Sequence, residues 1–466
     1  MEAAGSSPER IDALIRPIRA YYNSGATRPF AARRQALLAL REALRKHEPA
    51  LLEAMHADMR KPRFEAYLSD IGLVHAEISY ALRHLREWMS MQHVPTPLAI
   101  QLASSAVYHE PLGVVLIVAP WNYPVLLLLS PLVGAIAAGN CAVVKPSNEA
   151  PRTAAVVEQL ITEAFAPEHV CVAQGPGGVV VPRLLAQQRF DHIFFTGSQA
   201  VGARIMALAA PTLTSVTLEL GGKSPAIVDR KASIDTAARR IAWSKFFNAG
   251  QTCIATDHAL VHHAVMDEFL AAFADHVQRF FGDDPQRSPH FARLVNDKRF
   301  ATVTGYLGHG TVVLGGQHDA ADRYVAPTVL ARVSLESPPM REEIFGPVLP
   351  VLPWSEPEEV ITITQRNPWP LAAYIFSNDH KTQRYFTERI GFGGGCINHT
   401  MLQFGAPDLP FGGVGTSGMG RYHGHHSFER FSNVKGIAKG STWLDHRLQF
   451  PPYTSLKERL LRWVLR

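Results

Sequence analysis

The sequence predicts an α/β protein with two parallel-sheet domains. From residue 112 onward, short apolar runs alternate with amphipathic helical patterns, and a second series of the same kind begins near residue 218. Strands that alternate with helices at this spacing form parallel sheets with helices on both faces. A chain of 466 residues is also too long for one ordinary core, so two or three domains are expected.

The predicted elements follow in chain order. Residues 31–92 are expected to be helical, because apolar side chains recur every three or four positions among Arg, Glu and Lys. The first series has strands at 113–120, 140–147, 169–175 and 191–198 and helices at 150–165 and 199–210. The second series has strands at 224–229, 258–263 and 310–316 and helices at 234–247 and 265–281. We therefore divide the chain into domains at 1–215 and 216–416 and a third segment at 417–466.

Two stretches raise the question of a membrane. Residues 112–144 are strongly apolar, but their uninterrupted pieces are shorter than the roughly 20 residues that a spanning helix needs. The interruptions are Pro120, Asn122, Pro124 and Pro131. In the basic C-terminal tail, Leu456, Leu460 and Val464 share one helical face, which favours a packing or oligomer helix and leaves a membrane-surface anchor as the alternative. A membrane partner is thus not expected.

Composition narrows the functional classes. The net charge of +5 is mild for this length, and no block of Lys and Arg suggests a nucleic-acid partner. Four cysteines are too few for a disulfide framework, which favours reduced thiols in the cytoplasm. The first residues, MEAAGSSPER, do not resemble a signal peptide. The histidines at 423, 425 and 426 lack a zinc-like spacing with Cys or carboxylates, so no metal is expected.

Two features indicate a nucleotide site at the carboxyl ends of the first strands. Gly197 and Gly202 lie in a predicted strand-to-helix turn, where small residues let a pyrophosphate approach the helix N-terminus. Lys145 ends another predicted strand, where its ammonium could bond ribose hydroxyls. No G-x-G-x-x-G motif follows any of these strands, and turn glycines or a solvated lysine would explain each feature alone.

Cys253, in FFNAGQTCIAT, is either a small buried hydrophobic residue or a nucleophile. Cysteine chemistry needs an acid or base and donors for an oxyanion. Glu219 lies between leucines, where burial would raise its pKa toward that of a general base. Asn122, in a turn between prolines, carries an amide that can donate to an oxyanion, and Glu343 lies at the edge of another apolar run. Each residue taken alone also has a structural explanation.

Together these segments resemble the aldehyde dehydrogenase superfamily over almost the whole chain, and most closely its class 3 branch of fatty, aromatic and coniferyl aldehyde dehydrogenases. The resemblance lies in seven motifs in the family's order. They are PWNYP (120–124), KPS (145–147), FTGS with Gly202 (195–202), LELGGKSP (218–225), FNAGQTC (247–253), EEIFGPV (342–348) and LPFGGVGTSGMG (409–420).

The resemblance implies two Rossmann-like domains, one for the cofactor and one for catalysis, with a small β-arm at about 98–110 for oligomerisation, most simply as a homodimer. It implies that Cys253 forms a thiohemiacetal and then a thioester with an aldehyde, that Asn122 holds the oxyanion, and that Glu219 activates water. It also implies NAD or NADP as cofactor. The residues that it places around the cofactor are Trp121, Lys145, Thr196, Gly197, Ser198, Gly202, Leu220, Glu343 and Phe345.

Some points depart from the pattern or stay open. Asn148 stands where the family often has glutamate, which predicts weaker discrimination against the 2′-phosphate of NADP. Apolar residues in 399–408 favour an apolar aldehyde, aliphatic or aromatic. A cysteine hydrolase or acyltransferase with an unidentified histidine base, or a catalytically silent relative, are the alternatives.

Overall fold

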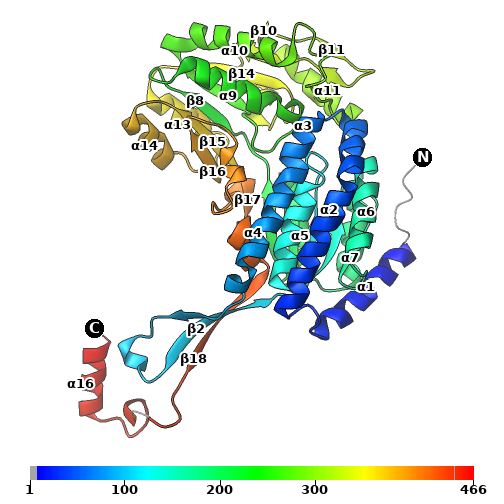
Figure 1. The fold of residues 1–466 in the computed structure, drawn as a ribbon. Helices are drawn as coiled ribbons and strands as arrows, with labels where there is room; N and C mark the ends of the chain where they lie inside the picture. Colours follow the sequence, from blue (N-terminus) through cyan, green and yellow to red (C-terminus); the bar gives the residue numbers. More distant parts are fainter. Residues whose placement is uncertain (1–7, 445–446, 466) are drawn as a thin grey trace.

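The computed structural model describes residues 8–444 and 447–465 and shows two α/β domains and a projecting arm (Figure 1). The first domain contains a six-stranded sheet and the second a seven-stranded sheet, and both are mainly parallel. The predicted fold class is therefore confirmed.

The first sheet is parallel except at its edge, where β17 pairs antiparallel with β7. Its strands in spatial order are β17 (Gly418–Met419), β7 (Ser215–Leu220), β6 (His192–Gly197), β3 (Val114–Val118), β4 (Cys141–Lys145) and β5 (Val170–Val172). All four strands predicted for the first series are present, as β3, β4, β5 and β6.

Helices cover both faces of this sheet, because side chains along a strand alternate between the two faces. On β3, Val115 and Ile117 pack into one core, whereas Val114, Leu116 and Val118 pack into the other. The first core includes α2 (Phe30–Met59), α4 (Gly72–Trp88), α5 (Leu126–Ala138) and α6 (Pro151–Ala164), and the second includes α1 (Pro8–Asn23), α7 (Gly177–Gln187) and α8 (Gln199–Ala209).

Two details of this domain bear on the predictions. The region predicted as helical is broken after α2, and α3 (Arg63–Ala66) with a π-helical turn (Tyr67–Ile71) leads into α4. The most apolar segment forms β3, α5 and β4, and every residue of α5 is buried within the protein. Among the described residues, no helix combines the length and apolar character needed to cross a membrane.

The second sheet is parallel except for its edge strand β10. Its strands in spatial order are β10 (Thr311–Leu314), β13 (Thr328–Ala331), β14 (Val348–Trp354), β9 (His258–His262), β8 (Pro225–Val228), β15 (Ala372–Phe376) and β16 (Gly394–Ile397). Its helices are α9 (Ile234–Phe246), α10 (Met266–Phe281), α11 (Asp297–Gly305), α12 (Pro338–Arg341), α13 (Pro357–Gln365) and α14 (His380–Arg389), beside a small hairpin of β11 (His318–Asp319) and β12 (Tyr324–Val325). The core on the α9 and α10 side is continuous with a core of the first domain.

The chain passes from the first sheet to the second between Leu220 and Pro225. Strand β7 continues the first sheet, because it pairs with β6 in parallel register and places Glu219 opposite Thr196. The change of sheet thus lies beyond residue 215, where we placed the domain boundary. The division of the chain into folding units at 215 and 416 stays a prediction.

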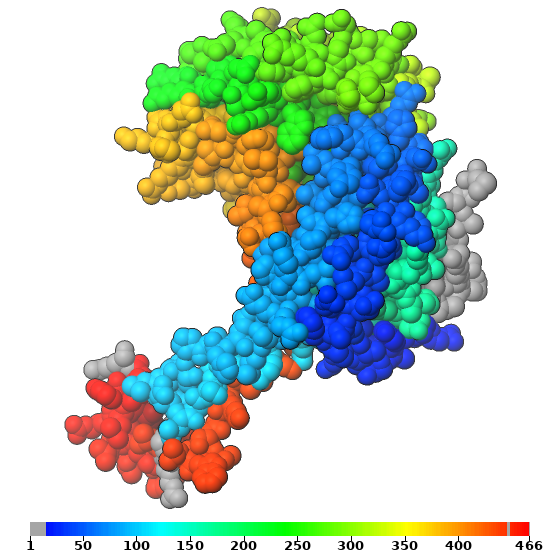
Figure 2. Space-filling model, in the orientation of Figure 1, coloured from blue at the N-terminus to red at the C-terminus, as the bar shows by residue number. Residues whose placement is uncertain are grey.

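The arm is an antiparallel sheet that stands clear of the body (Figures 1 and 2). It consists of β1 (Gln92–Val94), β2 (Ser104–Pro111) and β18 (Ser432–Lys439), and α15 (Gly424–Arg430) leads into β18. The helix expected in the C-terminal tail is present as α16 (Ser455–Val464), and it lies beside the 98–100 turn of the arm with no buried side chain. The arm predicted at 98–110 therefore exists, and its role in oligomerisation stays a prediction.

Candidate active site

Cys253 lies in a loop after α9 whose backbone conformation is fixed by its surroundings. Asn248 and Ala249 both have left-handed backbone angles, with φ of 53° and 52°, which residues with side chains adopt only when their surroundings hold them there. Gly250 approaches a second chain segment so closely that a Cβ on it would lie 2.3 Å from the Gly346 carbonyl oxygen. Glycine is therefore required at this position.

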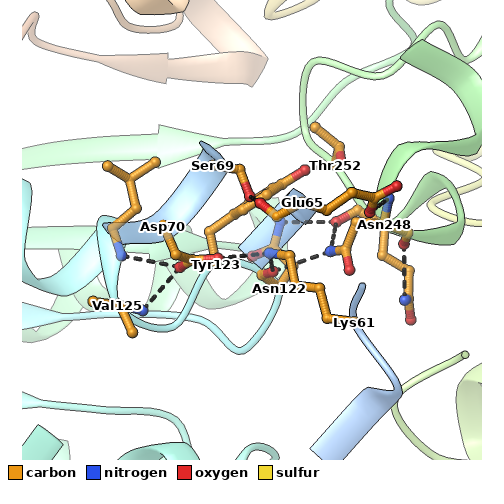
Figure 3. Close-up of polar contacts among 11 residues, drawn as sticks. Lys61, Glu65, Ser69, Asp70, Asn122, Tyr123, Val125, Asn248 and Thr252 are labelled. Carbon is orange, nitrogen blue, oxygen red and sulfur yellow. Dashed lines mark hydrogen bonds and ion pairs between the residues drawn. The ribbon is translucent and has the colours of Figure 1, made fainter. Parts of the chain in front are cut away.

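Hydrogen bonds tie this loop to the turn that carries Asn122 (Figure 3). The Asn248 side-chain amide donates to the backbone oxygens of Asn122 and Gln251, at 3.0 and 3.2 Å. The Asn122 amide also donates to the Gln251 oxygen, at 3.1 Å. The backbone N–H of Asn248 donates to the Glu65 carboxylate at 2.9 Å, and burial raises the pKa of this carboxyl to about 7. The structure thus brings the predicted oxyanion donor and the predicted nucleophile together.

A fully buried ion pair, Lys61 with Asp70, supports the Asn122 turn (Figure 3). Lys61 Nζ lies 2.6 Å from Asp70 Oδ2 and also donates to the Asn122 carbonyl oxygen at 3.2 Å. The other Asp70 oxygen accepts from the N–H groups of Val125 and Leu126, where α5 begins. Sequence reasoning missed this pair, because a lysine and an aspartate in a helical stretch are normally exposed to solvent.

Glu219 is buried beside Cys253. The carboxyl group is 1% exposed, its Oε1 atom has no hydrogen-bond partner among the described residues, and burial raises its pKa well above the ordinary value. Burial also raises the pKa of the Cys253 thiol, and the largest charge effects on that thiol come from Glu219 and Glu343. The cysteine's dominant charged neighbours are therefore carboxylates, whereas the hydrolase alternative calls for a histidine.

The predicted cofactor residues of the first domain lie at the carboxyl ends of its strands. Lys145 ends β4 and is 3% exposed, burial lowers its pKa to about 8, and no described residue accepts a hydrogen bond from its ammonium. The Thr196 hydroxyl on β6 is buried and equally without a described partner. Ser198 precedes α8, and Gly202 on that helix packs so closely on Leu220 that a Cβ would lie 2.8 Å from its side chain.

Glu343 and Phe345 approach these residues from the second domain. Glu343 contacts Gly221 so closely that a Cβ there would lie 1.9 Å from Oε2, and burial raises the pKa of Glu343 to about 8. The rings of Phe345 and Trp121 meet edge to face, with centroids 5.5 Å apart. These residues fit a dinucleotide, since Lys145 and the unpaired Thr196 hydroxyl lie at strand ends, and the N-terminus of α8 follows β6. Asn148 lies outside this buried group, on the surface beside Glu149.

Cys253 lines an apolar cavity of about 220 Å³. Tyr123, Trp243 and Phe247 contribute aromatic walls, and Met401 and Phe404 come from the loop that we predicted to shape substrate preference. The complete lining is Leu68, Ser69, Leu73, Tyr123, Leu126, Leu127, Trp243, Phe247, Thr252, Cys253, Ile254, Met401, Leu402, Phe404 and Gly405. Cys253 thus lines an apolar cavity while its thiol is also under the influence of the carboxylates Glu219 and Glu343.

Comparison with known proteins shows which protein family the chain resembles in sequence. The aldehyde dehydrogenase family's sequence model matches residues 1–437. Aldehyde dehydrogenase family 3 member B1 of Homo sapiens is 43% identical over 452 residues, covering 96% of each protein. The 4,4'-diaponeurosporen-aldehyde dehydrogenase of Staphylococcus aureus is 41% identical over 437 residues, covering 93% of this chain and 95% of that protein.

The fold agrees with the sequence. The solved structure of Staphylococcus aureus AldH in its substrate-bound state matches with a TM-score of 0.94 and 39% identity, covering 98% of this chain and 99% of that one. The expected resemblance is thereby confirmed. The chain belongs to the aldehyde dehydrogenase family and is an oxidoreductase that acts on the aldehyde group.

Proposed function

We propose that the enzyme oxidises apolar aldehydes to carboxylic acids through a thioester on Cys253, with NAD or NADP as the hydride acceptor. One observation carries the proposal: Cys253 lines an apolar cavity, and the two carboxylates that act on its thiol are the buried Glu219 and the partly buried Glu343. Solved members of the same fold hold NADP in one case and NAD+ in another.

The first step needs a thiolate. Burial, Glu219 and Glu343 all raise the pKa of Cys253, so the free enzyme holds a protonated thiol. Glu219, whose own pKa is raised by burial, is the group that accepts this proton. The sulfur then bonds to the aldehyde carbon and the carbonyl oxygen becomes an oxyanion.

Asn122 and the backbone N–H of Cys253 are the proposed oxyanion donors. One N–H of the Asn122 amide is directed to the Gln251 oxygen, which leaves its second N–H for the substrate. Preorganised donors of this kind stabilise the charge that develops in acyl chemistry. The hydrogen bonds from Lys61 and Asn248 to the Asn122 carbonyl hold the turn in place before substrate arrives.

When bound, NAD or NADP supplies the acceptor for the hydride that leaves the thiohemiacetal carbon. Glu219 then releases to solvent the proton that it took from Cys253. The ionised carboxylate removes a proton from water, the water oxygen bonds to the thioester carbon, and the carbon–sulfur bond breaks to give the carboxylic acid and the Cys253 thiolate. In this proposal Lys145 bonds ribose hydroxyls, and Glu343, which contacts Gly221, binds the nicotinamide ribose. Asn148, which carries no charge to repel a 2′-phosphate, allows both dinucleotides to be used.

A substrate panel tests the proposal. Aliphatic and aromatic aldehydes of increasing size are oxidised with NAD and with NADP, and reduced cofactor and acid are measured together. We expect equal amounts of both products and the highest kcat/KM for apolar aldehydes. Hydrolysis of esters without aldehyde-dependent reduction of cofactor would contradict the proposal and favour the hydrolase.

We also propose that the protein is a cytoplasmic homodimer. All four cysteines are free, which suits a reducing compartment. The arm and tail leave large apolar side chains exposed, such as Leu98 at 62%, Trp443 at 94% and Trp463 at 73%, and a second subunit would cover them. Sedimentation of the full chain tests the dimer, and a monomer would contradict it.

A further inference from the structure

A second cavity adjoins the one that contains Cys253. Its volume is about 480 Å³, and it lies between α2, α4, α5 and the loop around Phe404. Four residues line both cavities, namely Leu73, Leu126, Phe404 and Gly405. We call this second cavity the outer cavity. A molecule bound at Cys253 that extends past these four side chains therefore enters the outer cavity.

The outer cavity carries positive charge at its rim. Arg34 and Arg41 lie seven residues apart on α2, which places them two turns apart on one helix face, and Arg83 comes from α4. All three are exposed, and none forms an ion pair with a described residue. By contrast, the exposed carboxylate of Glu42 on α2 is paired with Arg45.

The acidic groups near these arginines do not cancel their charge. Glu77 is buried in the wall, where it accepts a hydrogen bond from the Gly424 N–H and burial raises its pKa to about 7. Asp408 accepts a hydrogen bond from the Tyr80 hydroxyl. The guanidinium of Arg83 lies over the Tyr80 ring, 5.8 Å from its centroid. Three guanidinium groups without an ion-pair partner thus share this region with one buried and one hydrogen-bonded carboxyl group.

The side chains that line both cavities are apolar, namely Leu73, Leu126 and Phe404. Leu38 and Leu82 add aliphatic side chains to the outer cavity. Along α4, Leu73 and Arg83 are ten residues apart, a distance of about 15 Å at the rise of an α-helix. An extended hydrocarbon chain that starts at Cys253 can therefore run along these apolar side chains until its far end reaches the arginines.

We propose that the outer cavity binds an anionic group at the far end of a long-chain aldehyde, so that the preferred substrates are apolar chains with an aldehyde at one end and a carboxylate or similar anion at the other. This inference rests on the function proposed above. Arginine suits the role, because its planar guanidinium bonds carboxylates and phosphates in a paired geometry. Anionic membrane lipids share this chemistry, but a concave site that continues the substrate cavity favours the end of a single molecule.

The test compares matched substrates. Aldehydes of graded chain length are prepared with a terminal carboxylate or its methyl ester, and kcat/KM is measured for each pair. Beyond the chain length that reaches the arginines, we expect the carboxylate to be preferred about fivefold, as one exposed ion pair allows. The preference should shrink as salt is raised. No preference at any length, with the esters still oxidised, would overturn this inference alone.

Variants test whether the three arginines cause the carboxylate preference. In Arg34→Gln/Arg41→Gln/Arg83→Gln the preference should vanish, while kcat/KM for the methyl esters stays within about twofold of the starting enzyme, because the three side chains are exposed. Arg239→Gln is the matched control, since Arg239 is an exposed arginine on α9 outside both cavities. Loss of the preference in the control would also overturn the inference.

Two further outcomes separate the alternatives. If neither member of any pair is oxidised, the function proposed above fails, and this inference fails with it. Binding to phosphatidylserine vesicles that the triple variant loses, in the absence of any carboxylate preference, would assign the arginines to a membrane surface and overturn the inference.

Discussion

The two sides of Cys253 are prepared for their ligands in opposite ways. On the proposed oxyanion side, hydrogen bonds within the protein fix Asn122 and the cysteine loop, and a buried ion pair lies behind them. On the proposed cofactor side, Lys145 is buried, and the buried Thr196 hydroxyl has no described hydrogen-bond partner. Donors for a transient oxyanion must be held in place before the charge forms, whereas polar groups that bind a cofactor can gain their hydrogen bonds when it arrives.

The largest effect is expected when Cys253 itself is replaced. Cys253→Ala should lower aldehyde-dependent cofactor reduction by roughly 10⁴- to 10⁶-fold, because no covalent intermediate can form. Steady-state kinetics with a saturating aldehyde measures this loss. Circular dichroism should show an unchanged fold, and activity near that of the starting enzyme would contradict the mechanism.

Glu219→Gln should slow hydrolysis of the thioester by about 10²- to 10⁴-fold. A base works when ionised, and burial raises the pKa of Glu219, so activity should fall as the pH drops below that raised value. The variant should lose this pH dependence. Rapid-quench experiments should also show a slower first turnover of reduced cofactor, because the glutamine cannot accept the Cys253 proton, whereas a normal steady-state rate would contradict the assignment of Glu219 as base.

Lys61→Met tests the internal support of the oxyanion side. Removing the lysine leaves Asp70 charged and buried, which should cost about 3 to 5 kcal/mol of unfolding free energy in urea denaturation. Asp70→Asn added to Lys61→Met should recover part of that loss, because the amide carries no charge. If the single variant were as stable as the starting protein, the pair would not support the Asn122 turn.

Lys145→Met tests the open cofactor side, and here binding rather than stability should change. Loss of hydrogen bonds from an ammonium should raise the cofactor Kd by about tenfold to a hundredfold. The folded pKa of Lys145 is lowered from 10.5 to about 8, so the stability of the free enzyme should rise between those pH values and the variant should lack that rise. Unchanged cofactor titrations would remove Lys145 from the site.

The smallest effect is expected at the surface. Asn148→Glu should increase the ratio of kcat/KM with NAD to that with NADP by about fivefold, because an exposed carboxylate repels the 2′-phosphate through screened charge. Asn148→Gln, which adds length without charge, is the control. A ratio that Glu leaves unchanged would show that Asn148 does not read the 2′ position.

The strands and helices near the site could be predicted because their signals are local. Apolar runs between turn residues predicted β3 to β6, and burial of Glu219 followed from its position between two leucines. The boundary at 215 differed from the observed change of sheet, because a strand's sequence does not state which neighbour it will pair with. Pairing of β7 with β6 depends on the path of α8 between them.

By itself, the sequence determined the α/β architecture, the family motifs and the residues expected around the cysteine. Only the tertiary structure decided that Lys61 and Asp70 are fully buried and paired, and that Arg34, Arg41 and Arg83 converge on one cavity. The physical reason is that periodicity reports which face of a helix turns inward, whereas the partner of a charged side chain is set by whichever distant segment packs against it.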